Sequence, residues 1–315
     1  MTDSLFSINI VTRNRREELK RAIRSVYSQK YRPVEIVVVD NASDDGTPDM
    51  VREEWPEIRL IELHRNIGCQ PGRNIGMKNC RGKYIFNLDD DGWLDKETLS
   101  LISNEFKGDH QLFVVSARVE SPAGEPINRQ VTDYGKIRRY VANFPGGASA
   151  IRTDSLNISG YFPEYPRGHA EADLSLRILD RGGRILYLPT AVMYHKLSQI
   201  HRDCNEIRYW SVRHRLETAF RLEPACYAFF DLFWKLFINF RVALRDNSLR
   251  GYFRGVSHFI YDIPLLIGRR NPVKREIIAR KNYLTRHRVI KIEDELIPEK
   301  YSLFSKIRDR LWNKH

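Results

Sequence analysis

The sequence predicts an α/β fold with a mostly parallel central sheet, followed by a helical C-terminal region. Short apolar runs alternate with amphipathic helical patterns from residue 6 to about residue 188, and polar residues directly follow several of these runs. After about residue 206 the strand-like runs stop, and aromatic, arginine-rich helical patterns replace them. We therefore expect two domains, residues 1–205 and residues 206–315.

Five apolar runs are the predicted strands of the first domain. They are Phe6–Val11, Val34–Asp40, Ile58–Leu63, Tyr84–Leu88 and Leu112–Val119. Between the first two strands, Leu19, Ile23 and Val26 recur at helical spacing and share one face. Between the second and third strands, Asp44–Thr47 combines turn residues with a helix cap. Helices that connect successive strands in this way favour a parallel sheet.

Polar side chains follow three of these strands where each strand ends. They are Thr12, Arg13 and Asn14 after the first strand, Asp40 and Asn41 at the end of the second, and Asp89, Asp90 and Asp91 after the fourth. In open α/β sheets, functional groups gather beyond the carboxyl ends of the strands. We therefore expect these side chains to lie along one edge of the sheet.

The three consecutive aspartates, Asp89 to Asp91, crowd like charges at the end of a buried strand. Such crowding is tolerable when a hard divalent cation, Mg²⁺ or Mn²⁺, bridges the carboxylates to phosphate oxygens of a ligand. A solvated acidic loop that caps the next helix is the alternative. The strand end and the polar residues beside it favour the metal site.

The positive charge of the chain is concentrated near its C-terminus. The formal net charge is +12, and residues 241–315 carry 18 Lys and Arg against 8 Asp and Glu. Such a segment attracts nucleic acid, an anionic bilayer or a phosphorylated substrate, and charge alone does not distinguish these partners.

The four cysteines, which are Cys69, Cys80, Cys204 and Cys226, form neither a disulfide framework nor a zinc pattern. The N-terminus lacks the pattern of a secretion signal, and no apolar run reaches the roughly eighteen residues of a spanning helix. We therefore expect a cytoplasmic protein that is not an integral membrane protein.

Five motifs occur in an order that is typical of one enzyme family. They are Ile36–Thr47, Asn66–Gly68 with Gly72–Gly76, Asn87–Asp91, Glu171–Arg177 and Pro189–His195. With these motifs the sequence resembles the family 2 glycosyltransferases over about residues 6 to 198. The resemblance implies the GT-A nucleotide-sugar-binding fold, a nucleotide-sugar donor and inversion at the anomeric carbon.

The resemblance also implies a nucleotide site. Asp40 would hydrogen-bond the base, usually uracil, and Thr12 and Arg73 would line the nucleotide pocket. Taken alone, Asp40 could cap a turn and Arg73 could pair with the acidic loop.

In the family, the aspartates after the fourth strand bind the metal ion and the ribose-diphosphate. Asp89 and Asp91 would hold the metal, Asp89 and Asp90 would contact the donor, and His195 would complete the metal shell. The metal ion would stabilise the charge that grows on the departing diphosphate. Outside the family pattern, an isolated histidine such as His195 is more often structural.

A direct displacement needs a carboxylate that deprotonates the acceptor hydroxyl. Many family members carry Glu-Asp-x-Asp-Leu where this chain has Ala170–Leu174. Aligned on Asp173 and Leu174, Glu171 takes the place of the catalytic Asp, and Ala170 replaces the preceding Glu. Glu171 is therefore the candidate base. Asp173 is the reserve candidate, with the capping of a helix from Leu174 to Asp180 as its alternative role.

The C-terminal region contains two amphipathic helical patterns within residues 224–270. In the first, Asp231, Lys235 and Asn239 form a polar stripe, and in the second, Arg254, His258 and Asp262 repeat the spacing. The remaining aromatic surface beside clustered Arg suits the interface of an anionic membrane. Packing on the catalytic domain or a homo-oligomer contact is the alternative.

The predicted function is metal-dependent, inverting sugar transfer from a UDP- or dTDP-sugar to a glycan or lipid-linked acceptor at the inner face of the cell membrane. A nucleotidyltransferase could use a similar acidic metal site but would not require the motifs around Glu171 and His195. A nucleic-acid-binding protein would explain the basic tail but not the acidic run, which repels phosphate in the absence of a metal.

Overall fold

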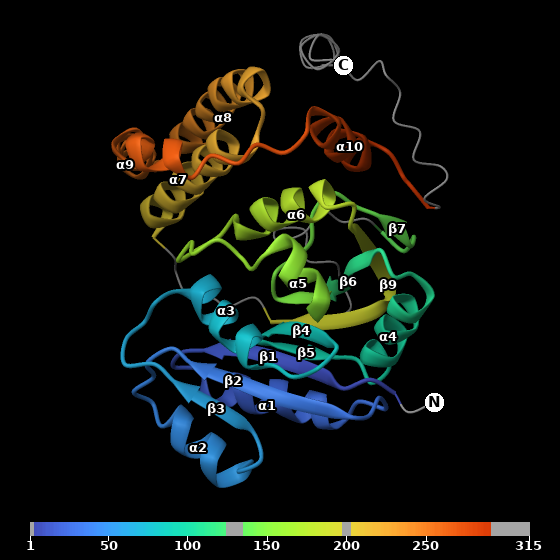
Figure 1. Ribbon diagram of the computed structural model, residues 1–315. Coiled ribbons are helices and arrows are strands. Elements are labelled where there is room, and N and C mark those ends of the chain that lie inside the picture. The colour runs from blue at the N-terminus through green and yellow to red at the C-terminus, as the bar shows by residue number, and fades with distance from the viewer. Residues whose placement is uncertain (1–2, 124–134, 197–202, 291–315) are drawn as a thin grey trace. The chain divides into compact units, whose positions relative to one another are not determined.

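The computed structural model describes residues 3–123, 135–196 and 203–290 of the chain (Figure 1). The chain divides into two compact units, residues 1–200 and residues 201–315. The N-terminal unit contains the sheet and its covering helices, and the C-terminal unit is helical.

The N-terminal unit alternates strands with helices. Its strands are β1 Phe6–Thr12, β2 Val34–Asp40, β3 Arg59–Glu62, β4 Tyr84–Asp89, β5 Gly92–Leu94, β6 Leu112–Glu120, β7 Arg139–Tyr140, β8 Ala148–Arg152 and β9 Arg184–His195. Its helices are α1 Arg16–Tyr27, α2 Thr47–Glu54, α3 Cys69–Asn79, α4 Thr98–Gly108, α5 Thr153–Ser159 and α6 Ala170–Asp180. The five predicted strands are confirmed as β1, β2, β3, β4 and β6, and each boundary agrees within one residue.

The strands form one sheet in the order β3-β2-β1-β4-β8-β6-β9-β5, with β7 paired to β9. The pairs β1/β2, β1/β4, β2/β3 and β6/β9 are parallel, whereas β8, β5 and β7 run against their neighbours. Six of the nine strands therefore share one direction, and the predicted α/β fold with a mostly parallel sheet is confirmed. The arrows of β1, β2 and β4 lie side by side in Figure 1.

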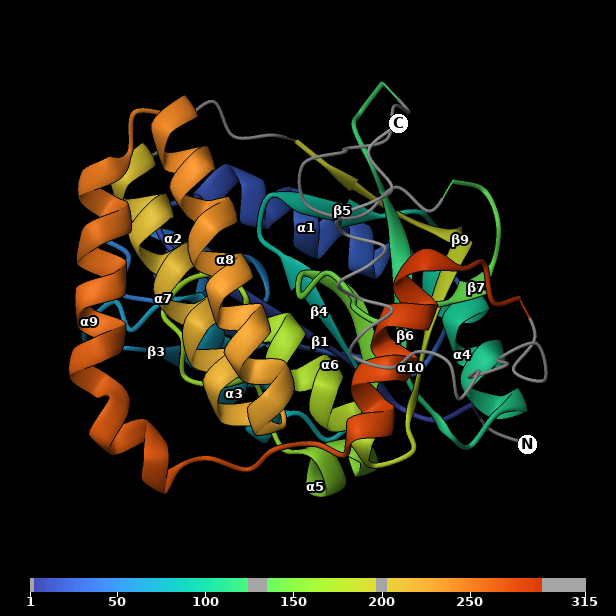
Figure 2. The same ribbon diagram turned by 90° about the horizontal axis from the view of Figure 1, so that it is seen from above.

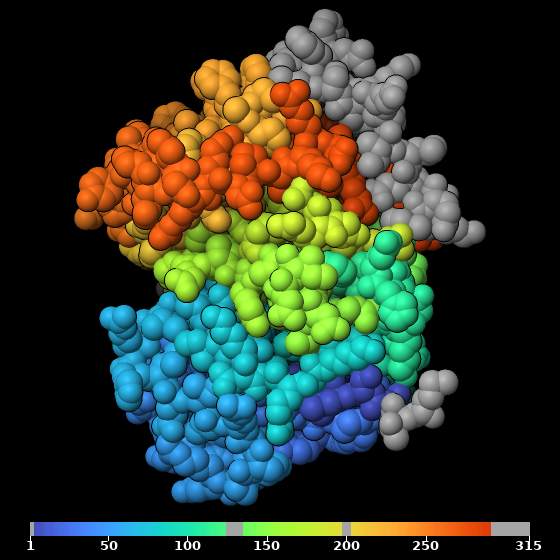
Figure 3. Space-filling model, viewed as in Figure 1, coloured from blue at the N-terminus to red at the C-terminus, as the bar shows by residue number. Residues whose placement is uncertain are grey.

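Apolar residues from both faces of the sheet form the core of the N-terminal unit. Leu19, Ile23 and Val26 of α1 are buried, which confirms the predicted helix face. The rings of Tyr84 in β4 and Phe106 in α4 stack 4.6 Å apart. The space-filling view shows one outer face of this unit, with atoms coloured from blue to yellow-green along the chain (Figure 3).

The C-terminal unit is helical, as predicted. Its helices are α7 Cys204–Leu222, α8 Ala225–Arg245, α9 Leu249–Gly268 and α10 Arg275–Arg286. The side chain of Asp203 caps α7 by accepting a hydrogen bond from the backbone N–H of Asn205 at 2.8 Å. Within the described part of the chain, none of the helices combines the length and the hydrophobicity that crossing a membrane requires.

Candidate active site

The ends of β1, β2 and β4 bring several predicted site residues together. Parallel pairing places Thr12 of β1 opposite Asp40 of β2 and places Val11 opposite Asp89 of β4. The Thr12 hydroxyl donates a hydrogen bond to Asp90 Oδ2 at 3.0 Å. The expectation that these strands end at a common edge is therefore correct.

Asp89, Asp91 and His195 form a group that can hold a metal ion. One ligand atom from each residue lies within 4.8 Å of the other two. The antiparallel pairing of β5 with β9 sets His195 opposite Gly92, next to the acidic run, and His195 Nε2 lies 2.9 Å from Asp91 Oδ1. His195 Nδ1 is buried and has no hydrogen-bond partner among the described residues. Two carboxylates and an imidazole are ligands that suit Mn²⁺, so the residues fit a divalent cation.

Arg15, which the sequence reasoning did not select, balances the charge of the aspartates. Its guanidinium donates to Asp90 Oδ1 at 3.3 Å and forms a short ion pair with Asp91. Burial opposes the charged form of Asp91, but the hydrogen bonds from His195 and Arg15 outweigh burial and lower the pKa of Asp91 to about 2. For Asp90, burial dominates and raises its pKa to about 7. Asp91 is therefore the firmly ionised carboxylate of this pair.

Arg73 connects the acidic cluster to Glu171. Its side chain is almost fully buried, forms a short ion pair with Asp89, and places Nη1 3.7 Å from Glu171 Oε1. Gln70 reinforces this link, because its Nε2 donates to Glu171 Oε1 at 3.0 Å and its Oε1 accepts from Arg73 Nη1 at 3.3 Å. Both Gln70 and Arg73 lie in the first turns of α3, so one helix start holds both partners of Glu171.

Two consecutive glycines, Gly146 and Gly147, allow the backbone before β8 to approach these side chains closely. A Cβ atom at Gly147 would lie 2.1 Å from Cγ of Asp89, and one at Gly146 would lie 2.4 Å from Glu171 Oε1. The backbone N–H of Asp89 also donates to the carbonyl of Gly147 at 3.1 Å. The glycine pair was the available sequence signal for this part of the site, and our reasoning did not use it.

Only one of the two carboxylate oxygens of Asp40 is hydrogen-bonded to a described residue. Its Oδ2 accepts from the backbone N–H of Ser43 at 2.9 Å, whereas its Oδ1 is buried and has no hydrogen-bond partner among the described residues. The next residue, Asn41, binds the following loop by accepting from the N–H of Ile67 at 2.9 Å and by donating to the carbonyl of Gly68 at 3.2 Å. Asp40 is thus held by a turn and retains an acceptor for a ligand.

The helix that carries Glu171 begins earlier than predicted. We expected a helix from Leu174 to Asp180 with Asp173 as its cap, but α6 begins at Ala170, after two left-handed residues, Gly168 and His169. The capping role of Asp173 is therefore wrong: Asp173 lies inside the helix, is fully buried and is paired with Arg177 at 2.8 Å. Glu171 lies in the first turn instead, where the helix dipole favours a carboxylate.

The loop before α6 is tied to the start of α3. The backbone N–H of Cys69 donates to the carbonyl of Pro166 at 3.1 Å. A Cβ atom at Gly68 would lie 2.5 Å from that same carbonyl oxygen, so this close approach requires glycine.

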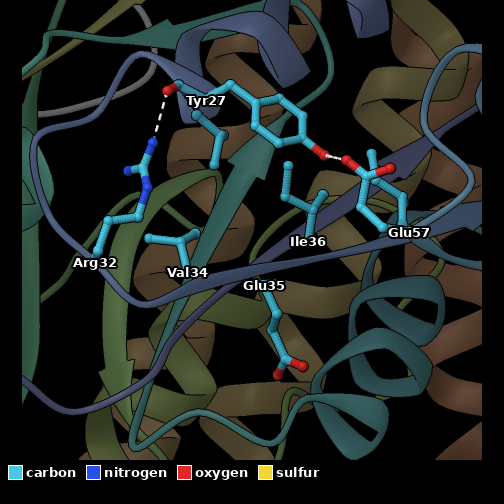
Figure 4. Close-up of a pocket in the computed structure, with 8 residues that line it drawn as sticks. Tyr27, Arg32, Val34, Glu35, Ile36 and Glu57 are labelled. Atoms are coloured by element: carbon cyan, nitrogen blue, oxygen red, sulfur yellow. Dashed lines mark hydrogen bonds between the residues drawn. The ribbon is translucent and has the colours of Figure 1, made fainter.

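A small pocket in the N-terminal unit lies apart from this cluster. It has a volume of about 270 Å³ and is lined mainly by the end of α1 and the first residues of β2. There Tyr27 donates a hydrogen bond to the Glu57 carboxylate, and Arg32 donates to the carbonyl of Tyr27 at 2.8 Å (Figure 4). None of the residues that line this pocket is a predicted site residue. Asp40, the predicted site residue of β2, lies at the other end of that strand.

Residues 7–165 match the family model described as Glycosyl transferase family 2, which is half of the chain. The chain belongs to glycosyl transferase family 2. The predicted family membership and the prediction of a glycosyltransferase are both confirmed. The match favours a glycosyltransferase over the two alternatives, which were a nucleotidyltransferase and a nucleic-acid-binding protein.

This glycosyltransferase is similar to proteins of several bacteria. It is 28% identical over 204 residues to the uncharacterized glycosyltransferase YwdF of Bacillus subtilis, a match that covers 61% of this chain and 74% of YwdF. It is 24% identical over 198 residues to the poly-beta-1,6-N-acetyl-D-glucosamine synthase of Staphylococcus aureus, which covers 58% of this chain and 47% of the synthase. The chain therefore spans less than half of that larger relative.

Solved structures show the same fold at low sequence identity. Residues 1–349 of S. aureus TarS superpose with a TM-score of 0.60 at 18% identity, covering 89% of this chain and 86% of that one. The mannosyltransferase PcManGT from Pyrobaculum calidifontis, in complex with GDP-Man and Mn²⁺, gives a TM-score of 0.57 at 19% identity and covers 99% of this chain and 88% of that one. The family 2 glycosyltransferase described here thus has the GT-A fold.

Proposed function

We propose that this family 2 glycosyltransferase moves a sugar from a UDP- or dTDP-sugar to a hydroxyl of a glycan or lipid-linked acceptor, with a divalent cation and with inversion at the anomeric carbon. One observation carries the proposal: Arg73 pairs with Asp89 of the metal-binding group on one side and lies beside Glu171 on the other. The cluster therefore offers groups for the leaving diphosphate and for the attacking hydroxyl within one site.

In this proposal, the acidic edge receives the donor. Asp89, Asp91 and His195 would hold Mn²⁺ or Mg²⁺, which when bound stabilises the negative charge of the departing diphosphate. Asp40 would accept a hydrogen bond from the base through its unpaired Oδ1, and Thr12 and Asp90 would lie beside the ribose and the phosphates. A structural neighbour supports a nucleotide-sugar donor, since TarS has been solved in complex with UDP-GlcNAc.

Glu171 would act as the general base. Its carboxylate would take the proton of the acceptor hydroxyl as that oxygen attacks the anomeric carbon. Arg73 and Gln70 contact its Oε1 and so orient the carboxylate. As a base, Glu171 would form no covalent bond to the sugar. A single displacement with a base of this kind inverts the anomeric configuration.

We further propose that the enzyme works in the cytoplasm at the inner face of the cell membrane, where lipid-linked acceptors are available. The basic excess of residues 241–315 supports this location. The domain boundary near residue 205 and a homo-oligomer remain predictions of the sequence.

The test is a panel of nucleotide sugars incubated with the purified protein and Mn²⁺, with released nucleoside diphosphate as the readout. We expect one UDP- or dTDP-sugar to be consumed, and chelation by EDTA to stop turnover. Asp91→Ala should abolish both turnover and metal-supported donor binding. Full activity of Asp91→Ala in the presence of EDTA would refute the metal-dependent reaction.

A further inference from the structure

Exposed hydrophobic side chains are concentrated on α8 and α9. Of the sixteen large hydrophobic residues that are exposed in the described ranges, eleven lie on these two helices. We call them the aromatic face, and they are Phe229, Phe230, Phe233, Phe237, Phe240 and Leu244 on α8, and Phe253, Ile260, Tyr261, Leu265 and Ile267 on α9. The exposed fraction reaches 73% at Phe233 and 83% at Tyr261. Exposed apolar surface gathered in this way indicates an interaction site.

The polar side of helix α8 faces the protein and its apolar side faces outward, which is the reverse of the orientation expected for a surface helix in water. Its polar stripe points inward: Asp231 and Asn239 are buried, and Lys235 pairs with Asp231 at 2.5 Å. Asn239 Oδ1 also accepts from Arg208 of α7 at 3.3 Å. The phenylalanines, spaced three and four residues apart, occupy the outer side. A surface helix in water places its polar side outward, so the outer side of α8 is suited to an apolar environment.

Helix α9 repeats this arrangement. All three residues of its polar stripe are bound to α7: Arg254 to Glu206 at 2.7 Å, His258 to the Tyr209 hydroxyl at 2.7 Å, and Asp262 to Arg213 at 2.6 Å. Figures 1 and 2 show α7, α8 and α9 side by side within the C-terminal unit. The aromatic face is therefore the side of α8 and α9 that these polar contacts leave uncovered.

The two helices form one surface, and this surface carries positive charge. The ring of Phe240 in α8 lies 6.5 Å from that of Phe253 in α9. Arg241 lies over the ring of Phe237 at 5.9 Å, and Arg250 at the start of α9 is exposed. The carboxylates of this segment are engaged, because Asp231, Asp246 and Asp262 each form an ion pair.

We propose that the aromatic face binds an anionic lipid bilayer, with its phenylalanines inserted between the headgroups and its arginines in contact with lipid phosphates. Aromatic side chains beside arginine suit this boundary, and anionic lipids attract each arginine. A second copy of the chain is the other occupant that could cover the face, and the experiment below separates it from lipid. The proposal builds on the location proposed above, by naming the surface and the lipid charge, and it is independent of the sugar-transfer reaction.

The test is flotation of the full chain with vesicles of phosphatidylcholine alone or of phosphatidylcholine with phosphatidylglycerol. We expect binding to the anionic vesicles that weakens at high salt. Replacing Phe229, Phe233 and Phe237 by Ser should lower the partition coefficient at least about 100-fold, because burial of one phenylalanine contributes on the order of tenfold. Arg241→Glu with Arg250→Glu should weaken binding by about 25-fold or more, since one arginine contributes about fivefold.

A matched control removes an exposed hydrophobic residue elsewhere. Ile158 on α5 is 52% exposed, and Ile158→Ser should leave vesicle binding unchanged. Release of the nucleoside diphosphate from the active donor in solution should also be unchanged in all variants, which separates this proposal from the proposed reaction.

Three results would overturn the proposal. The first is equal binding of the wild type and the triple serine variant to anionic vesicles. The second is a dimer in solution that the serine variant dissociates, because a second copy would then cover the face. The third is a lower unfolding temperature of the serine variant, measured without lipid, because the face would then be internal packing.

Discussion

A methyl group added at Gly147 would test whether the position of the Asp89 carboxylate controls the reaction. In Gly147→Ala, the new Cβ would meet Cγ and Oδ1 of Asp89 at 2.1 Å and Oδ2 at 2.2 Å, whereas ordinary contacts begin at 3.4 Å. The carboxylate must therefore move by more than 1 Å, and its ion pair with Arg73 must change. Gly147 does not have a positive φ, so alanine is compatible with its backbone.

A displacement of this size at a reacting centre costs on the order of 100-fold in rate. We therefore expect kcat/KM of Gly147→Ala to fall about 100-fold, which corresponds to about 2.7 kcal/mol of transition-state stabilisation. The assay is nucleoside diphosphate release at several Mn²⁺ and donor concentrations, with calorimetric titration of the nucleoside diphosphate. Weakened metal-supported binding should accompany the loss of rate.

The control for this substitution is Gly108→Ala at the end of α4, where an added Cβ meets nothing within 4 Å. It should keep wild-type kinetics and thermal stability. If Gly147→Ala retained wild-type kcat/KM and metal-supported donor binding, Asp89 would not have the role that we assign to it.

Three other substitutions separate the base from its surroundings. Glu171→Gln should keep donor binding, measured by titration, but lower transfer by about 10² or more, and unchanged transfer would mean that another group is the base. Gln70→Met removes the 3.0 Å hydrogen bond to Glu171, so kcat should fall about 10- to 100-fold with little change in donor KM; an effect on KM alone would contradict this role. Asp173→Ala breaks a buried ion pair with Arg177 and should lower the free energy of unfolding by about 3–5 kcal/mol in urea denaturation, whereas wild-type stability with a selective loss of kcat would restore Asp173 as a candidate base.

Four of the parallel strands were predictable because they are mainly apolar segments of strand length. β1, β2, β4 and β6 are buried along most of their length, so their sequences show no competing helical period. Our five predicted strands did not include β5, β7 and β8, which have only two to five residues, too few for a periodic pattern. They also did not include β9, which has twelve residues but whose apolar run is interrupted by Pro189 and Thr190. The start of α6 was misplaced because Gly168 and His169 end the preceding loop with a left-handed turn, which hydrophobic spacing does not indicate.

The candidate site was predictable where a motif marks it and not where it depends on long-range contacts. The aspartates and His195 were found through their motifs, and the structure brings them together. Gln70 was not selected, because its partner Glu171 is 101 residues away in the sequence. Arg15 was missed because its partners lie 75 and 76 residues away.

The link between Cys69 and Pro166 joins two parts of the molecule with different proposed tasks. Residues of α3 contact the groups assigned to the donor, whereas the loop around Pro166 leads into the helix that carries the proposed base. With glycine at position 68 there is no side chain between the two backbones, and a shift of that loop would pull on the start of α3. Attempts to change acceptor choice by altering this loop would therefore also change the affinity for the nucleotide, and both quantities need to be measured in each variant.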